Sequence, residues 1–289
     1  MSSTFVAAAT QRAIDARRAR VLVTTGNDRD PTAGGRSQAL CEALNQHCAR
    51  QLLAIWESRF AASVRPATLV RMLEDHAADF ILVVDSSGTL LRLRGGAEFR
   101  LHGGIGVLRV RNVLGGGNDA LTSVCALREG DVFVDGTAGQ LQDALVAAAA
   151  VGASGRVIAI EASPLLWAVT SGRPARTEDA DVDRLLNERL EVRLGEAAQV
   201  LAAMPDASAD VVYFDPMWQA PSKSSASFEV LRTLAHAAPL DAAAIREATR
   251  VARRTVVVMD QIGGNELERL GIPVVSIGQR KRYGVISRT

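Results

Sequence analysis

The stretch ADVVYFDPMW, residues 209–218, decides how the rest of this chain is interpreted. Its four consecutive apolar residues, Val211 to Phe214, predict a short strand that is buried on both faces. The run ends abruptly in Asp215 and Pro216, and Trp218 follows. We therefore expect the strand to deliver a carboxylate to a cleft. In the alternative interpretation, Asp215 caps the next segment and Trp218 belongs to the core.

Composition indicates an ordinary globular protein. The chain has 289 residues, 48% of them hydrophobic, which is enough for one large or two modest domains. A formal net charge of +1 gives no strong basic field, and leaves RNA binding open. Cys41, His47 and Cys48 lie close in sequence but lack the spacing of a zinc site, so we expect no metal.

No segment has the pattern of a secretory signal or a membrane span. Met1 to Arg20 lacks an apolar stretch followed by a cleavage site. No later run approaches the ~18 apolar residues that a membrane-spanning helix needs. We therefore expect a cytoplasmic protein that does not bind membranes.

The first 95 residues alternate between strand and helix patterns. Strands are predicted at 20–25, 51–56, 80–85 and 90–93, and helices at 32–50 and 66–76. This alternation predicts a small accessory α/β domain over residues 1–95. It carries no catalytic constellation, so we expect it to serve substrate recognition or dimer contacts.

Glycines are frequent in residues 96–126, which we interpret as a connector that could fold over the cleft. A helix is predicted within it at 105–114. His102 stands at its start and is a candidate substrate contact, although a structural or surface histidine is the alternative.

The pattern becomes regular from Asp131 onward. A strand at 132–135, a glycine-containing turn, a helix at 140–151 and a strand at 156–160 form a βαβ unit typical of doubly wound nucleotide-binding folds. Further strands are predicted at 190–194 and 255–259, and further helices up to 204 and at 225–238 and 241–252.

The last two predicted strands, 272–277 and 283–287, are too close in sequence for a helical crossover, so they must pair antiparallel. A mostly parallel α/β sheet that ends in an antiparallel hairpin resembles the Rossmann-like class I S-adenosylmethionine-dependent methyltransferase fold. We expect this domain to span residues 127–289.

That fold implies how the motifs meet. Its first and fourth strands lie side by side where the strand order reverses, so Asp135 and Asp215 should face one crevice. Gly136 and Gly139 should let the backbone approach the methionyl part of S-adenosyl-L-methionine. Glu161 should accept the ribose hydroxyls.

Residues 127–288 resemble the small-subunit ribosomal RNA guanine-N2 methyltransferase family, and more closely its relatives with an added N-terminal α/β domain. The matching stretches are DGTAGQLQDA at 135–144, EASP at 161–164, YFDPMW at 213–218 and KS at 223–224. The resemblance implies cofactor contacts at Gln142, Asp143, Glu161, Ala162, Glu196, Ala197 and Asp215.

The resemblance also implies the chemistry. Asp215 and the Pro216 carbonyl would accept the two hydrogens of an exocyclic amine, and Trp218 would stack on the base. Met217 stands in the substrate motif, and Lys223 is a candidate phosphate contact or a solvated loop lysine. The implied partner is ribosomal RNA or the small ribosomal subunit; a homodimer is left open.

Two residues depart from the family pattern. Trp218 replaces the usual phenylalanine, and Leu141 replaces a second glycine. A leucine in a turn that requires positive φ is strained, so either the turn differs or cofactor binding is weakened. Two other functions therefore remain open: methylation of a small molecule or protein, and a non-catalytic binding protein with the same fold.

Overall fold

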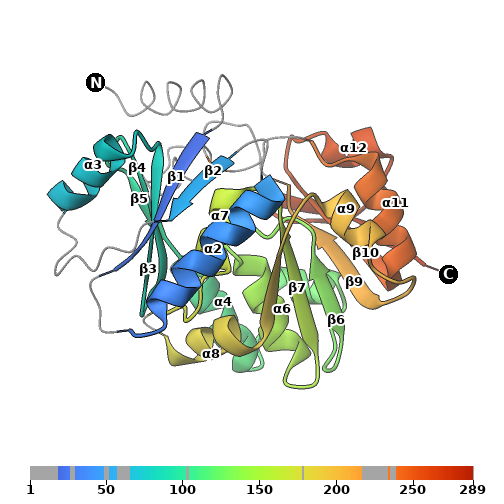
Figure 1. The fold of residues 1–289 in the computed structure, drawn as a ribbon. Helices are drawn as coiled ribbons and strands as arrows, with labels where there is room; N and C mark the ends of the chain where they lie inside the picture. The colour runs from blue at the N-terminus through green and yellow to red at the C-terminus, as the bar shows by residue number, and fades with distance from the viewer. Residues whose placement is uncertain are drawn as a thin grey trace. The chain divides into compact units, whose positions relative to one another are not determined.

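The computed structural model describes residues 19–26, 30–48, 52–56, 66–101, 104–177, 179–216, 234 and 239–288. The chain divides into two compact units (Figure 1). The first comprises Met1–His102, Pro164–Arg176 and Pro221–Ala235, and the second comprises Gly103–Ser163, Thr177–Ala220 and His236–Thr289. The predicted domain limits at 95 and 126 stay a prediction. The predicted helix at 225–238 lies outside the described residues except for Leu234.

The first unit is built on a five-stranded sheet in the order β2-β1-β3-β4-β5. Its strands are β1 (Ala19–Thr25), β2 (Leu52–Trp56), β3 (Phe80–Asp85), β4 (Gly88–Leu93) and β5 (Glu98–Arg100). β2, β1 and β3 are parallel, and β4 and β5 continue antiparallel. The sequence FILVV of β3 is buried throughout, as a central strand covered on both faces requires.

Helices cover both faces of this sheet. They are α2 (Ala33–Cys48), α3 (Pro66–Asp75) and α7 (Pro164–Thr170). α3 packs on β3 through a cluster that includes Leu69, Leu73 and Ile81. α2 packs on β1, β2 and β3, and α7 contacts both β4 and α2.

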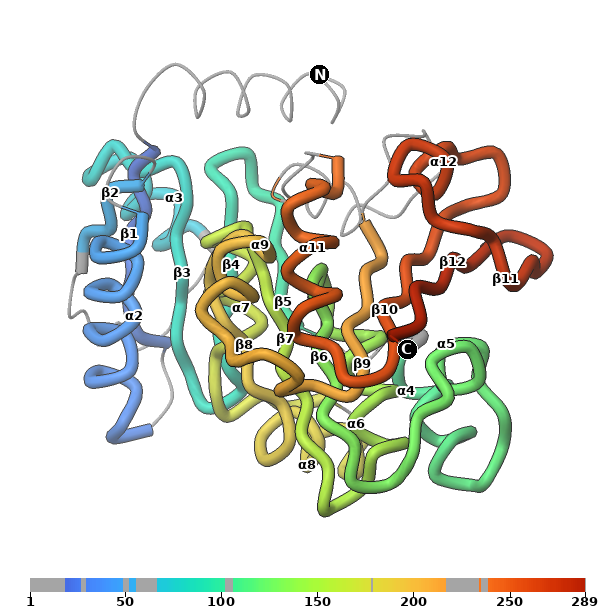
Figure 2. Tube along the Cα trace, turned by 90° about the vertical axis from the view of Figure 1, so that its right-hand side faces the viewer, coloured from blue at the N-terminus to red at the C-terminus, as the bar shows by residue number. Residues whose placement is uncertain are grey.

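The second unit holds a seven-stranded sheet in the order β11-β12-β10-β9-β6-β7-β8 (Figure 2). Its strands are β6 (Val132–Asp135), β7 (Arg156–Glu161), β8 (Leu190–Leu194), β9 (Ala209–Phe214), β10 (Ala252–Gln261), β11 (Val274–Ile277) and β12 (Lys281–Ser287). The five strands from β10 to β8 are parallel, whereas β12 pairs antiparallel with β10 and β11. The predicted antiparallel ending is confirmed.

Helices also form two layers here. α4 (Gly104–Leu114), α5 (Ala120–Val124), α6 (Gln142–Val151) and α8 (Ala180–Glu188) pack together on one side. On the other side α9 (Ala197–Ala202), α11 (Ala242–Val251) and α12 (Glu266–Leu270) cover the strands. The β9 residues Val212 and Phe214 join the core on this second side, and the alternate residues Val211 and Tyr213 are buried on the opposite face, so the motif strand is apolar on both faces.

Aspartates begin several helices by accepting backbone N–H bonds. Asp241 caps α11 as predicted, accepting from the Ala243 N–H at 2.9 Å. Asp119 and Asp179 cap α5 and α8 in the same way. The sequence prediction missed three short elements, β5, α5 and α12, because three to five residues are too few to show a period.

Leu141 adopts the left-handed conformation, with φ 62° and ψ 15°. The helix predicted from Gln140 consequently starts at Gln142, with Leu141 as its N-cap residue. The Leu141 side chain is fully buried, so burial of its apolar surface offsets the cost of the backbone conformation. The leucine therefore occupies a positive-φ position.

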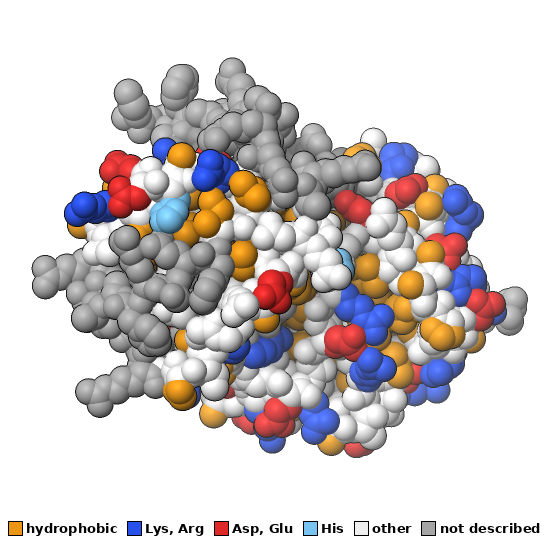
Figure 3. All heavy atoms as spheres, in the orientation of Figure 1, with side chains coloured by type: hydrophobic (Ala, Val, Ile, Leu, Met, Phe, Trp, Pro, Cys, Tyr) orange, Lys and Arg blue, Asp and Glu red, His pale blue; other side chains and the backbone are white. Residues whose placement is uncertain are grey.

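None of the helices in the described part of the chain is long and apolar enough to cross a membrane. On the face shown in Figure 3, basic and acidic side chains are interspersed. Among the described residues many charged side chains form ion pairs, such as Arg254 with Asp131 at 2.6 Å.

Two substitutions at Leu141 separate backbone strain from burial. Leu141→Ala should lower the free energy of unfolding by about 2–5 kcal/mol, because it opens a cavity and keeps the strained φ. Leu141→Gly should cost about 1 kcal/mol less than the alanine variant, because glycine adopts positive φ freely. Urea unfolding of both variants measures the difference; a glycine variant less stable than the alanine variant would contradict it.

Candidate active site

The parallel pairing of β6 with β9 brings the ends of these strands together. Asp135 is the last residue of β6 and lies opposite Tyr213, while Asp215 follows β9 directly. Asp135 is buried, and one of its carboxylate oxygens accepts the Thr137 N–H at 3.0 Å. Burial, and then the nearby Asp143, raise the pKa of Asp135 well above its usual value.

The turn after β6 fits closely against neighbouring strands. The Gly136 N–H donates to the Tyr213 carbonyl at 2.8 Å, and a Cβ on Gly136 would lie 2.2 Å from a carbon of the Phe214 ring. Only glycine fits there. Further on, Gly139 has φ +50° and its N–H donates to the Glu161 carboxylate at 2.9 Å. The turn is therefore fixed to both β9 and β7.

Glu161 is the last residue of β7 and is buried, and its carboxylate accepts hydrogen bonds from the backbone. Besides Gly139, the Ser163 N–H donates to it at 2.8 Å. Burial raises the pKa of Glu161 to about 7, with Glu196 adding a smaller repulsive contribution. Glu196 itself precedes α9, and Ala197 is the first residue of that helix.

Asp143 lies in the first turn of α6 and is held by two side chains that the sequence analysis did not connect with it. Arg109 of α4 donates to one carboxylate oxygen at 2.5 Å, and the Tyr213 hydroxyl donates to the other at 3.2 Å. Arg109 also forms a two-bond pair with Asp119, at 2.8 Å for each bond. Nothing in the local sequence relates Arg109 to Asp143.

Asp215 lies close to Asp135 and Asp143. Its backbone N–H donates to the Thr137 hydroxyl at 2.7 Å, which links the motif to the turn after β6. Burial and then Asp143 raise the pKa of Asp215 to about 7, while Lys281 opposes the rise. The Lys281 ammonium, from β12, lies 3.5 Å from the Asp215 carboxylate. The sequence analysis did not predict this contact between Lys281 and Asp215.

The structure thus brings three predicted acids together: Asp135, Asp143 and Asp215. Glu161 belongs to the same electrostatic environment, since it contributes to the raised pKa of Asp135. The other predicted residues within the described part of the chain lie beside these, namely Gln142 at the start of α6, Ala162 after β7, and Pro216. Four predicted residues, His102, Met217, Trp218 and Lys223, lie outside the described residues. In the described part of the chain, no group of three acidic, histidine or cysteine side chains could hold a metal ion.

Comparison with known proteins decides the family. Residues 71–287 match a family model described as "Putative SAM-dependent methyltransferase". The chain belongs to this family of S-adenosylmethionine-dependent methyltransferases. Its cofactor is therefore S-adenosylmethionine.

Individual relatives agree with the family. The uncharacterized protein YpiP of Bacillus subtilis (strain 168) is 34% identical over 224 residues, which is 76% of this chain and 86% of that protein. Ribosomal RNA small subunit methyltransferase J of Laribacter hongkongensis (strain HLHK9) is 30% identical over 206 residues, covering 67% of this chain and 72% of that protein. The crystal structure of a SAM-dependent methyltransferase from Neisseria gonorrhoeae aligns over 93% of this chain and 95% of its own, with a TM-score of 0.55 at 20% identity. That likeness supports the class I methyltransferase fold.

The acids suit this cofactor. S-adenosylmethionine supplies a methyl group activated by a positively charged sulfonium. Carboxyls that raise one another's pKa are stabilised in their ionised form when a cation lies among them. The N-terminus of α6 adds backbone N–H groups where an α-carboxylate would be held. The residues present therefore fit the cofactor.

Cofactor affinity should depend on pH. Because the pKa values of Glu161 and Asp215 are raised to about 7, these carboxyls hold protons in mildly acidic solution and must lose them to stabilise a cation. Affinity should rise as these protons are released, from about pH 5.5 to 7, by up to about tenfold for each carboxyl, and level off above. Calorimetry over this range measures the slope.

S-adenosylhomocysteine is the matched control, because it has the same amino acid and nucleoside but a neutral sulfur. Its affinity should change less with pH than that of S-adenosylmethionine. Equal slopes for the two ligands would show that the sulfonium does not interact with these acids.

Proposed function

We propose that this methyltransferase transfers the methyl group to an exocyclic amine of guanine in ribosomal RNA. The supporting observation is the placement of Asp215 and Pro216 directly after β9, beside the turn that follows β6. A strand-end carboxylate followed by the Pro216 carbonyl offers two acceptors for the two hydrogens of an amine. The name of the Laribacter hongkongensis relative supports a ribosomal substrate.

The reaction in this proposal depends mainly on orientation. An exocyclic nitrogen conjugated with a base is a poor nucleophile, so its lone pair must be aimed at the methyl group. Ionised Asp215 and the Pro216 carbonyl hold the two N–H bonds, and Trp218 stacks on the base. The N–C bond forms as the C–S bond breaks, and the methylated nitrogen then loses one proton. Burial raises the pKa of Asp215 from its ordinary value to about 7, so its carboxylate can take that proton.

The substrate is tested with small ribosomal subunits and naked small-subunit RNA from cells that lack the gene. Labelled S-adenosylmethionine should transfer its methyl group to the RNA, and digestion should release N2-methylguanosine. Label in another nucleoside would contradict the guanine amine. Label only in protein or in small molecules would favour the other methyltransferase functions, and no transfer to any fraction would favour a non-catalytic protein.

Removing the Asp215 carboxylate should abolish transfer but spare cofactor binding. For Asp215→Ala we expect kcat to fall at least about a hundredfold, because the amine loses an oriented acceptor. The dissociation constant for S-adenosylmethionine should stay within about tenfold of the original. Asp215→Asn is the control of equal size: its amide oxygen keeps one acceptor for the amine but the negative charge is lost, so it should retain more activity than the alanine variant. Persisting activity in the alanine variant would remove Asp215 from the mechanism.

Lys281 should set the pH at which Asp215 becomes active. Its ammonium lowers the pKa of Asp215, so Lys281→Met should shift the rise of kcat/KM for S-adenosylmethionine from about pH 7 to higher pH. Lys281→Arg keeps the charge and should leave the midpoint near its original value. The profile of each variant between about pH 5.5 and 9 gives the measurement. An unchanged midpoint in the methionine variant would show that Lys281 does not act on Asp215.

A further inference from the structure

Helix α4 carries an arginine to the acid group, which consists of Asp135, Asp143 and Asp215. α4 packs on α6 within the second unit. The two helices are close at Gly106, where an added Cβ would lie 3.6 Å from the Cα of Gln142. Arg109 follows three residues later, on the same face of α4. Its side chain therefore reaches the first turn of α6, where Asp143 lies.

All three guanidinium nitrogens of Arg109 donate to carboxylates. Nε and Nη2 donate to the two oxygens of Asp119, at 2.8 Å each, and Nη1 donates to Oδ1 of Asp143 at 2.5 Å. The side chains of Arg109, Asp119 and Asp143 are only 25%, 10% and 12% exposed. Because a planar guanidinium fixes the directions of its bonds, the position of Asp119 determines where Arg109 holds Asp143.

Asp119 is itself fixed by its place at the start of α5. Its side chain caps this helix by accepting the Leu121 N–H at 2.9 Å. Its backbone carbonyl accepts the Thr122 hydroxyl, also at 2.9 Å. α5 in turn packs on α6. Arg109 is therefore anchored on one side and bonds to Asp143 on the other.

The second oxygen of Asp143 is held from β9. The Tyr213 hydroxyl donates to it at 3.2 Å, and the buried Tyr213 ring stacks on Phe133 with the ring centroids 6.0 Å apart. After burial, Asp143 is the largest cause of the raised pKa values of Asp135 and Asp215, so its charge acts directly on both. Both oxygens of this carboxylate thus have fixed donors, one from α4 and one from β9.

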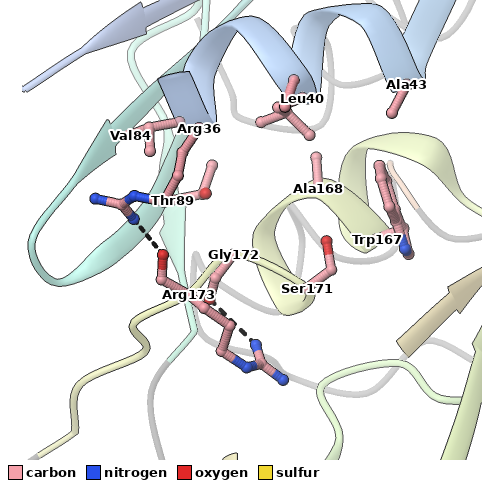
Figure 4. A pocket seen from close by; sticks show the side chains of 11 residues that line it. Arg36, Leu40, Ala43, Val84, Thr89, Trp167, Ala168, Ser171, Gly172 and Arg173 are labelled. Carbon is pink, nitrogen blue, oxygen red and sulfur yellow. Dashed lines mark hydrogen bonds between the residues drawn. The ribbon is translucent and has the colours of Figure 1, made fainter. Parts of the chain in front are cut away.

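Arg36 in the first unit shows a different arrangement, in which an arginine joins segments of backbone. It reaches from α2 to the Arg173 carbonyl at the wall of a pocket of about 320 Å³ (Figure 4). It also donates to the Asp85 carbonyl at 3.2 Å and pairs with Asp30. Arg36 and Arg109 are both 25% exposed, so exposure does not distinguish them. The acceptors do, because one acceptor of Arg109 belongs to the acid group.

We propose that Arg109 is a positioning residue for the cofactor, and that it orients the Asp143 carboxylate for binding S-adenosylmethionine. Asp119 acts one step further away, by fixing Arg109. The proposal rests on the predicted role of Asp143 as a cofactor contact. It does not depend on the RNA substrate.

Charge and position predict opposite effects when Arg109 is removed. The arginine is a cation beside acids that receive a cationic cofactor. If its charge only competed with the sulfonium, its removal should strengthen binding. If it positions Asp143, its removal should weaken binding, because the carboxylate loses its orientation. The sign of the change therefore distinguishes the two roles.

Calorimetric titration with S-adenosylmethionine measures this sign. At about pH 8.5 the carboxyls whose pKa is raised to about 7 are ionised, so proton uptake does not mask the effect. Arg109→Met should raise the Kd at least about tenfold. Arg109→Lys keeps the charge but offers one donor nitrogen in place of three, so the Kd should rise by a smaller factor. Asp119→Asn keeps the cap of α5 and should raise the Kd about three- to tenfold.

Arg111→Met is the matched control. Arg111 lies on the same helix and donates at 2.5 Å to Asp179, which caps α8 as Asp119 caps α5. Asp179 does not belong to the acid group. Arg111→Met should therefore leave the Kd within about twofold, although it also removes an ion pair of α4. Urea unfolding of the unliganded variants shows whether Arg109→Met and Arg111→Met are folded.

A double-mutant cycle tests whether Arg109 acts through Asp143. Asp143→Ala alone should raise the Kd at least about tenfold. Adding Arg109→Met to Asp143→Ala should change the Kd by less than about threefold, because the arginine then has no carboxylate to orient. Additive effects would overturn the proposal, as would unchanged or tighter binding in either single variant. No RNA enters this assay, so its outcome is separate from that of the methylation assay.

Discussion

The parallel pairing of β6 with β9 is the constraint on which the active site depends. It places Asp135 opposite Tyr213 and brings Asp215 to the turn that follows β6. The Thr137 hydroxyl then accepts the Asp215 N–H, so the first and fourth strands of the fold are joined at their carboxyl ends. If this pairing slipped by one residue, every side chain of β9 would change face and the carboxylate would leave the group.

Grouping acids in this way is unfavourable for the protein alone. Burial and mutual repulsion raise the pKa values of Asp135, Glu161 and Asp215, so part of the group is neutral near pH 7. Arg109, Tyr213 and Lys281 compensate only in part, through Asp143 and Asp215. A cation bound among these acids would remove the remaining repulsion, and we propose that this favours a sulfonium cofactor.

Sequence reasoning identified most of the strands and the residues at their ends, because apolar runs and the glycines and acids that follow them are local signals. It placed the start of α6 two residues early, since the left-handed Leu141 is invisible to periodicity. It also missed β5, α5 and α12, which are too short for a periodic pattern. Trp218 and Lys223 remain sequence predictions, because they lie outside the described residues.

The sequence by itself determined the alternation of strands and helices, the antiparallel ending of the second sheet and the family to which the chain belongs. These follow from local periodicity, connection length and short motifs. Only the tertiary structure decided which charges meet. Arg109 and Asp143 are 34 residues apart, Asp215 and Lys281 lie on different strands, and Arg36 reaches the Arg173 backbone across 137 residues. Such contacts depend on packing between segments that are distant in sequence, so no local sequence pattern predicts them.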